Sequence, residues 1–68
     1  MAPRSDHAEL STLRSALKES TDRVVTVADR YRDSEDSAIA GDLDSAERGL
    51  VMARRAIDRA LKALAEIG

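Results

Sequence analysis

The chain has 68 residues and a formal net charge of −2, charged residues make up 35% of it, and Tyr31 is its one aromatic residue. This length limits it to one small domain, whose core is marginally stable without a disulfide, a metal or oligomerisation. The lack of cysteine excludes disulfides and thiolate metal sites, a single histidine (His7) excludes a histidine-rich metal site, and the nearly balanced charge gives no general case for binding nucleic acid.

The sequence offers no candidate for membrane insertion. It contains no run of 18 apolar residues, and its start at residues 1–4 lacks the apolar segment of a secretory signal peptide. We therefore expect a cytoplasmic protein with no membrane partner and no cofactor.

The first predicted helix covers residues 5–32. Asp6 and Glu9 lie near its start, where the helix dipole favours negative charge. Apolar residues then recur at the three-and-four spacing of an amphipathic helix, with Ser20 as a small polar gap. These seam residues are Leu10, Leu13, Leu17, Val24, Val27 and Tyr31.

We predict a turn at residues 33–36, which are all polar and include strong helix-capping types. Arg30 and Arg32 precede the turn, as suits the end of a helix. One alternative is a turn at Gly41, and another is a continuous rod without a turn.

The pairing of the two halves favours the turn at 33–36. This turn places Leu10 opposite Ile57 and Leu17 opposite Leu50. It also places Lys18 near Glu47 and Arg23 near Asp44, so charges of opposite sign meet across the helices. A turn at Gly41 leaves Leu10 without a partner.

The second predicted helix covers residues 35–67 and carries a heptad seam sustained over four repeats. One seam column holds Leu43, Leu50, Ile57 and Leu64, and the other holds Ile39, Ala46, Ala53, Ala60 and Ile67. The alanine column, together with Gly41 and Gly49, suggests a close approach of the helices. We therefore predict an all-α fold, an antiparallel two-helix hairpin that forms one domain over residues 1–68.

Both helices are apolar over a wider arc than one partner helix requires. The additional residues are Ala16, Val25 and Ala28 in the first helix, and Met52, Ala56, Ala63 and Ile67 in the second. Two hairpins packed as a four-helix bundle would cover them, so we predict a homodimer.

The predicted function is non-enzymatic protein–protein interaction, as a small self-associating scaffold or adaptor, or as a regulator of a larger partner. No nucleophile–base pair, phosphate loop or metal quartet is present in the sequence. The alternative is a ligand- or nucleic-acid-binding regulator that uses a basic face, formed by Arg54, Arg55, Arg59 and Lys62. Without any binding role, these four residues are explained as a solvent-exposed face that pairs with acidic residues of the first helix.

Two short patterns resemble known families of helical hairpins. The segment from Tyr31 to Glu35 resembles the Tyr-x-x-x-Asp/Glu signal of type VII secretion substrates, although the Trp-x-Gly turn is absent and Tyr31 lies mid-chain. Ser11, Arg14 and Asp22 match three positions of the pattern of cyclic-di-GMP-binding anti-sigma factors, while His7 and Lys18 replace its Glu and Gln. These matches are too short to assign a family. The first resemblance implies a secreted helical hairpin as a further alternative.

Overall fold

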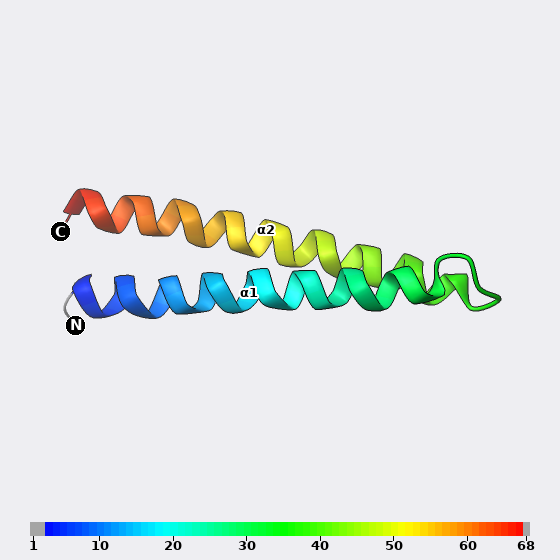
Figure 1. Ribbon diagram of the computed structural model, residues 1–68. Helices are drawn as coiled ribbons and strands as arrows, with labels where there is room; N and C mark the ends of the chain where they lie inside the picture. Colours follow the sequence, from blue (N-terminus) through cyan, green and yellow to red (C-terminus); the bar gives the residue numbers. More distant parts are fainter. Residues whose placement is uncertain (1–2, 68) are drawn as a thin grey trace.

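The computed structural model describes residues 3–67, which form two long helices, α1 (Pro3–Tyr31) and α2 (Ser37–Ile67). The helices run antiparallel beside each other, so both ends of the chain lie at the same end of the molecule (Figure 1). The resulting rod measures 52 × 14 × 13 Å. The prediction of an all-α helical hairpin is confirmed. Within the described residues, no helix is both long enough and apolar enough to cross a membrane.

Helix α1 remains regular through a segment rich in β-branched residues. Its threonines donate their hydroxyl hydrogen bonds to backbone carbonyls four residues earlier, with oxygen–oxygen distances of 3.1 Å for Thr12, 2.7 Å for Thr21 and 3.0 Å for Thr26. These bonds satisfy the hydroxyls within the helix, so Thr21 can be buried at the interface without a polar partner on α2. Asp6 in the first turn and Arg30 in the last turn match the helix dipole.

The chain reverses over residues 32–36, where hydrogen bonds from serine and aspartate hold the turn. Both the Ser34 N–H and the Ser34 hydroxyl donate to the carbonyl of Tyr31, at 3.1 and 2.8 Å. The Asp36 N–H donates to the Ser34 hydroxyl at 3.1 Å, and the Ile39 N–H donates to the Asp36 carbonyl at 2.9 Å. Gly41 lies inside α2. The chain therefore does not turn at Gly41, and it does not form a continuous rod.

The interface between the helices is thin. Only Ala28, Ala40 and Leu61 among the described apolar residues are buried, at 1%, 3% and 6% exposure. The larger apolar residues that face the other helix are half-buried: Leu10, Leu17, Val24 and Tyr31 on α1, and Leu43, Leu50, Ile57 and Leu64 on α2. One column of the predicted seam on each helix therefore does face the partner helix.

The other column of the predicted seam lies outside the interface. Leu13, Val27 and Ile39 are 47%, 36% and 41% exposed. Ala46, Ala53 and Ala60 are also exposed. The columns that replace them are Thr21 and Ala28 on α1, and Ala40, Glu47, Arg54 and Leu61 on α2. Each helix is thus rotated about its own axis relative to the expected seam, and the rotation buries the small residues Ala28 and Ala40 between the two helices.

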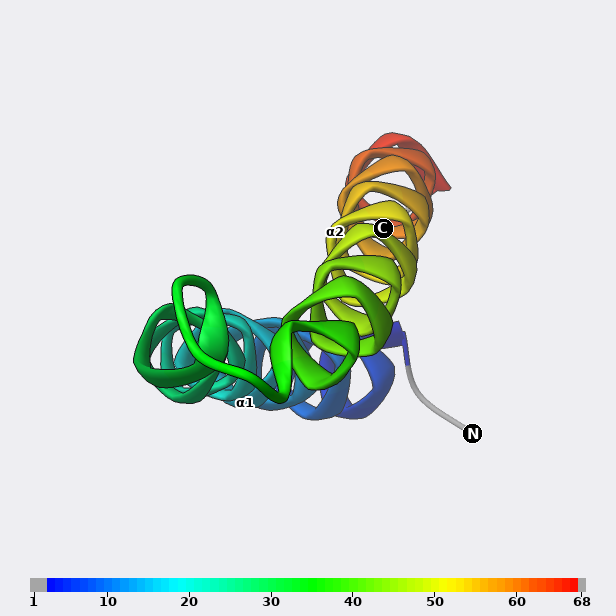
Figure 2. The ribbon, with the colours of Figure 1, turned by 90° about the vertical axis from the view of Figure 1, so that its right-hand side faces the viewer.

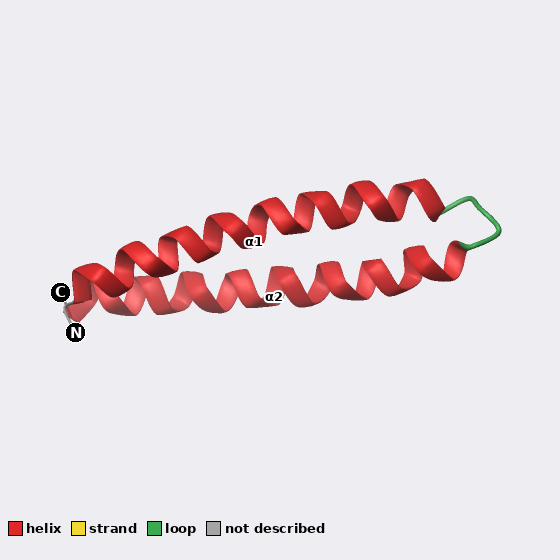
Figure 3. Cartoon of the chain, turned by 90° about the horizontal axis from the view of Figure 1, so that it is seen from below, coloured by secondary structure: helices red, strands yellow, loops and turns green. Residues whose placement is uncertain are grey.

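The helices also wind about each other. They overlap near the turn in Figure 1 and near the chain ends in Figure 3, and the end-on view in Figure 2 shows the direction from one helix to the other changing along the rod. Winding of this kind keeps a seven-residue repeat in contact over a long distance, because a straight helix drifts relative to that repeat.

The two glycines of α2 are not sites of close approach within the hairpin. A Cβ atom built on Gly41 or Gly49 meets nothing within 4 Å. Both residues are exposed. Glycine at an unrestrained helix position is destabilising relative to alanine, since it loses more backbone freedom on folding.

The substitution Gly41→Ala is therefore expected to stabilise the protein by about 1 kcal/mol, which corresponds to a rise in Tm of roughly 4–8 °C for a domain of this size. Thermal unfolding followed by circular dichroism at a fixed protein concentration measures this shift. A lower Tm for the alanine variant would show that the side of α2 bearing Gly41 is covered closely in solution.

Candidate interaction site

The hairpin has two unlike long sides, one ionic and one apolar. Each helix presents two seam columns to the other helix, with one flanking column on either side. Because the helices are antiparallel, like flanking columns of α1 and α2 lie on the same side of the hairpin. One side carries the flanking columns Ser11, Lys18, Val25 and Arg32 of α1, and Asp44, Val51, Asp58 and Ala65 of α2. We call this the ionic side.

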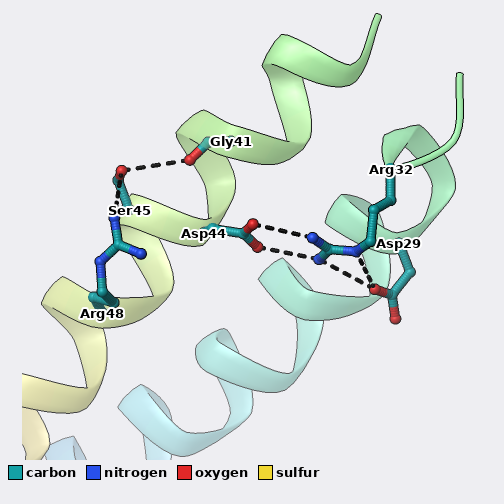
Figure 4. Close-up of polar contacts among 6 residues, drawn as sticks. All are labelled: Asp29, Arg32, Gly41, Asp44, Ser45 and Arg48. Carbon is teal, nitrogen blue, oxygen red and sulfur yellow. Dashed lines mark hydrogen bonds and ion pairs between the residues drawn. The ribbon is translucent and has the colours of Figure 1, made fainter.

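The ionic side is closed near the turn by a pair of charged groups. The Arg32 guanidinium donates two hydrogen bonds to the Asp44 carboxylate, at 3.0 and 3.1 Å, and also contacts Asp29 at 3.3 Å (Figure 4). These bonds lower the pKa of Asp44 below its ordinary value and outweigh the opposite effect of partial burial. The same contact with Asp44 raises the pKa of Arg32. Sequence reasoning did not find this pair, because it assigned Asp44 to Arg23.

A second charge pair closes the ionic side further from the turn. Arg14 contacts Asp58 at 3.2 Å across the helices. Between the two pairs, Val25 and Val51 are both half-buried on this side. Contacts within one chain therefore bridge this side at two points.

The expected cross-helix pairs of Lys18 and Arg23 do not form. Lys18 instead contacts Asp22 at 3.6 Å, and Arg23 contacts Glu19 at 2.8 Å. Both pairs lie within α1 at a spacing of four residues, the spacing at which side chains on a helix surface meet. The rotation of the helices moves Arg23 to an outer column away from α2, whereas Lys18 lies in a groove with Asp58 of α2 but pairs within its own helix.

The opposite side is apolar and open, and we call it the apolar face. Its flanking columns are Leu13, Ser20 and Val27 of α1, and Ile39, Ala46, Ala53, Ala60 and Ile67 of α2. The next columns outward hold Glu9, Ala16, Arg23 and Arg30 of α1, and Asp42, Gly49, Ala56 and Ala63 of α2, so the outer edge of the face is charged on α1 and mostly small on α2. All of these residues are exposed. Among the described residues, no ion pair crosses between the helices on this side.

Most of the residues predicted to contact a second chain lie on or beside the apolar face. Ala16, Ala56, Ala63 and Ile67 belong to it, whereas Met52, which is 67% exposed, lines a groove with Asp44 and Val51 of the ionic side. The other two do not belong to it either. Ala28 is buried between the helices, and Val25 lies on the ionic side, because the rotated seam changes the faces that these residues present.

The four residues of the predicted basic face divide between two environments. Arg54 is half-buried and lines a groove on the ionic side with Arg14, Lys18 and Asp58. Arg55, Arg59 and Lys62 are exposed. Only these three can form a continuous cationic surface.

The described residues contain no group of three or more His, Cys, Asp or Glu side chains placed to hold a metal ion. The residues of the two family resemblances are also dispersed. Tyr31 is half-buried as the last residue of α1, whereas Glu35 is exposed in the turn. Arg14 is already paired with Asp58.

Comparison with known proteins shows no matching protein-family model, no matching curated protein and no matching solved structure. Neither resemblance noted in the sequence is therefore accompanied by a family match.

The Arg32–Asp44 pair predicts a specific dependence of stability on pH. Because Asp44 has a lower pKa in the folded chain than in the unfolded chain, its contribution is present above an ordinary carboxyl pKa of about 4. That contribution is lost as the pH falls through the folded pKa. Wild type should be more stable than Asp44→Asn at pH 7, and the difference should shrink towards about pH 2.

Urea unfolding at a series of pH values measures this difference. Asp42→Asn is the matched control, because Asp42 is exposed and forms no ion pair among the described residues. A gap between wild type and Asp44→Asn that stays constant down to pH 2 would exclude the charge pair as its cause.

Proposed function

We propose that the chain is a non-catalytic protein–protein interaction module whose apolar face binds a second copy of itself, giving a four-helix bundle. The observation that carries the proposal is the position of this face, which no other part of the described chain covers, while ion pairs between the helices bridge the ionic side at two points. Such a dimer would act as a scaffold or adaptor, or as the regulator of a larger partner, through the surfaces left outside the bundle.

The exposed area is consistent with a missing partner. The accessible surface is 5098 Å² for a chain of 7.4 kDa. A compact monomer of this mass exposes about 4,200 Å², so the hairpin exposes an excess of about 900 Å². A stable interface buries about 800 Å² on each partner. The excess is therefore as large as one side of an ordinary dimer interface.

The thin core supports the same proposal. No large side chain among the described residues is fully buried. The chain contains no cysteine, so disulfides cannot compensate. Oligomerisation is the supplement that an apolar face can provide to a small domain of this kind.

A second candidate function, binding of nucleic acid or another polyanion, rests on the exposed cations Arg55, Arg59 and Lys62. Within the described residues, none of the three takes part in an ion pair. Cations that neutralise phosphates give binding that weakens steeply as salt rises.

This candidate predicts that a labelled single-stranded oligonucleotide binds the protein at low salt and dissociates as salt rises. Lys62→Ala should reduce the slope of log K against log salt by about 0.7, the contribution of one phosphate contact on a single strand. Fluorescence anisotropy measures the slope, with Lys18→Ala as the control on the ionic side. An oligonucleotide that stays free at low salt contradicts the candidate.

Dimerisation through the apolar face predicts that Ala56→Glu weakens self-association. Its charge would be buried at the interface without a partner, which costs at least about 2 kcal/mol, a loss of roughly 30-fold or more in affinity. Ala65→Glu is the matched control, since the same change is made in the same helix on the ionic side. Sedimentation equilibrium measures association, and circular dichroism measures helix content.

The expected result is a wild-type dimer at micromolar concentration that Ala65→Glu preserves. A folded wild-type monomer at that concentration excludes the proposal. Equal weakening by the two variants excludes the apolar face as the site of contact.

A further inference from the structure

We infer that the two copies pair helix α2 against helix α2 in antiparallel orientation, with the two-fold axis passing Ala53 and the turns at opposite ends of the bundle. This arrangement rests on the proposed self-association and specifies its geometry. In this arrangement α2 of the second copy covers the α2 half of the apolar face, and α1 of the second copy covers the α1 half.

The first argument is the symmetry of the exposed column on α2. Ala46 and Ala60 lie seven residues to either side of Ala53, and Ile39 and Ile67 lie fourteen residues to either side. In a two-fold contact, residue i meets residue j of the other copy and residue j meets residue i. An axis at Ala53 therefore pairs Ile39 with Ile67 of the second copy, and Ala46 with Ala60.

The second argument is the size of the side chains between the two isoleucines. Every position of the two outer columns of α2 over residues 46–63 is small: Ala46, Gly49, Ala53, Ala56, Ala60 and Ala63. A Cβ built on Gly49 meets nothing within 4 Å beyond the backbone of its own helix turn. Two helices with small contact residues can approach closely, and the larger Ile39 and Ile67, which are 41% and 75% exposed, would close the ends.

The third argument is that helix α1 shares the same axis. The Arg14–Asp58 and Arg32–Asp44 contacts fix the relative height of the helices and set Ala53 level with residues 19–23 of α1. Ser20 lies in that range, and it is the centre of the α1 part of the apolar face. Leu13 and Val27 lie seven residues to either side of it, so one axis pairs large residues with large residues on both helices.

Charges along the edge of α1 agree with this orientation. Glu9 lies eleven residues before Ser20 and Arg30 lies ten residues after it, in the outer column of the apolar face that also holds Ala16 and Arg23. The axis therefore places Glu9 of each copy near Arg30 of the other. Opposite charges at the rim of an interface fix orientation more than they add affinity.

Single-cysteine variants test the arrangement cleanly, because the natural chain has no cysteine. Ala53→Cys lies beside the axis and should oxidise to a disulfide-linked dimer, whereas Ala65→Cys on the ionic side should remain monomeric on a denaturing gel. Glu66→Cys carries a spin label at an exposed position. The two labels should be about 39 Å apart, twice the thirteen-residue rise from Ala53.

Two outcomes separate this inference from the function on which it rests. A dimer with turns at the same end brings the two Glu66→Cys labels within roughly 20 Å, the width of a four-helix bundle. That distance overturns the α2 pairing and leaves the dimer intact. A monomer in sedimentation equilibrium overturns both the dimer and its geometry.

Discussion

The structure depends on a contact between two helices that have too little apolar material to form a closed core alone. Each helix contributes one column of large residues, such as Leu17 and Leu50, and a second column that mixes small and charged residues. Ala28 and Ala40 bring the backbones together near the turn, whereas Glu47 and Arg54 occupy seam positions and are half-buried. A long charged side chain can cover a seam with its stem while its charged end stays in water. The hairpin therefore closes along its length without burying a large side chain completely.

The ion pairs of the hairpin determine its geometry more than its stability. Arg32, Asp44, Arg14 and Asp58 are all partly exposed, with side-chain exposures from 34% to 49%. Exposed pairs of this kind contribute little net free energy, because water and salt screen them and ordering the side chains has an entropic cost. Both cross-helix pairs of the described residues nevertheless lie on one side, so they fix the rotation of both helices and leave the other side apolar. The rotation that these pairs accompany leaves the more apolar second column of each helix, with Leu13 and Val27 on α1 and Ile39 on α2, outside the interface.

The sequence was sufficient to predict the helices, the turn and the antiparallel orientation, because each depends on a local or strongly periodic signal. Asp33 and Ser34 mark the turn, and the Leu43–Leu64 column marks the inner face of α2.

The rotation of the helices could not be predicted. On α2 the Leu43–Leu64 column has the Ile39–Ile67 column on one side and the column of Ala40, Glu47, Arg54 and Leu61 on the other, and it can form a heptad seam with either. Choosing between Ala46 and Ala40 as the inner residue requires the contact between Arg32 and Asp44, which joins residues on different helices and leaves no periodic trace. The expected interaction residues followed the same logic: Ala56 and Ala63 lie on the apolar face, but Ala28 and Val25 do not.

The apolar columns of α2 also account for the proposed division between contacts inside the chain and contacts to a second chain. A helix that meets one neighbour needs two columns, and a third column is useful only with another neighbour. The hairpin uses the large column, with Leu50 and Ile57, for the seam that a single chain can form. The column that stays outside this seam has mostly alanine side chains. They are too small to fill a gap between two helices that lie apart, but they allow a second helix to approach closely. The exposed column is symmetric about Ala53, whereas the seam within one chain joins two different sequences and has no need of such symmetry. A repeat that reads alike in both directions is the pattern expected where a helix meets another copy of itself running the opposite way.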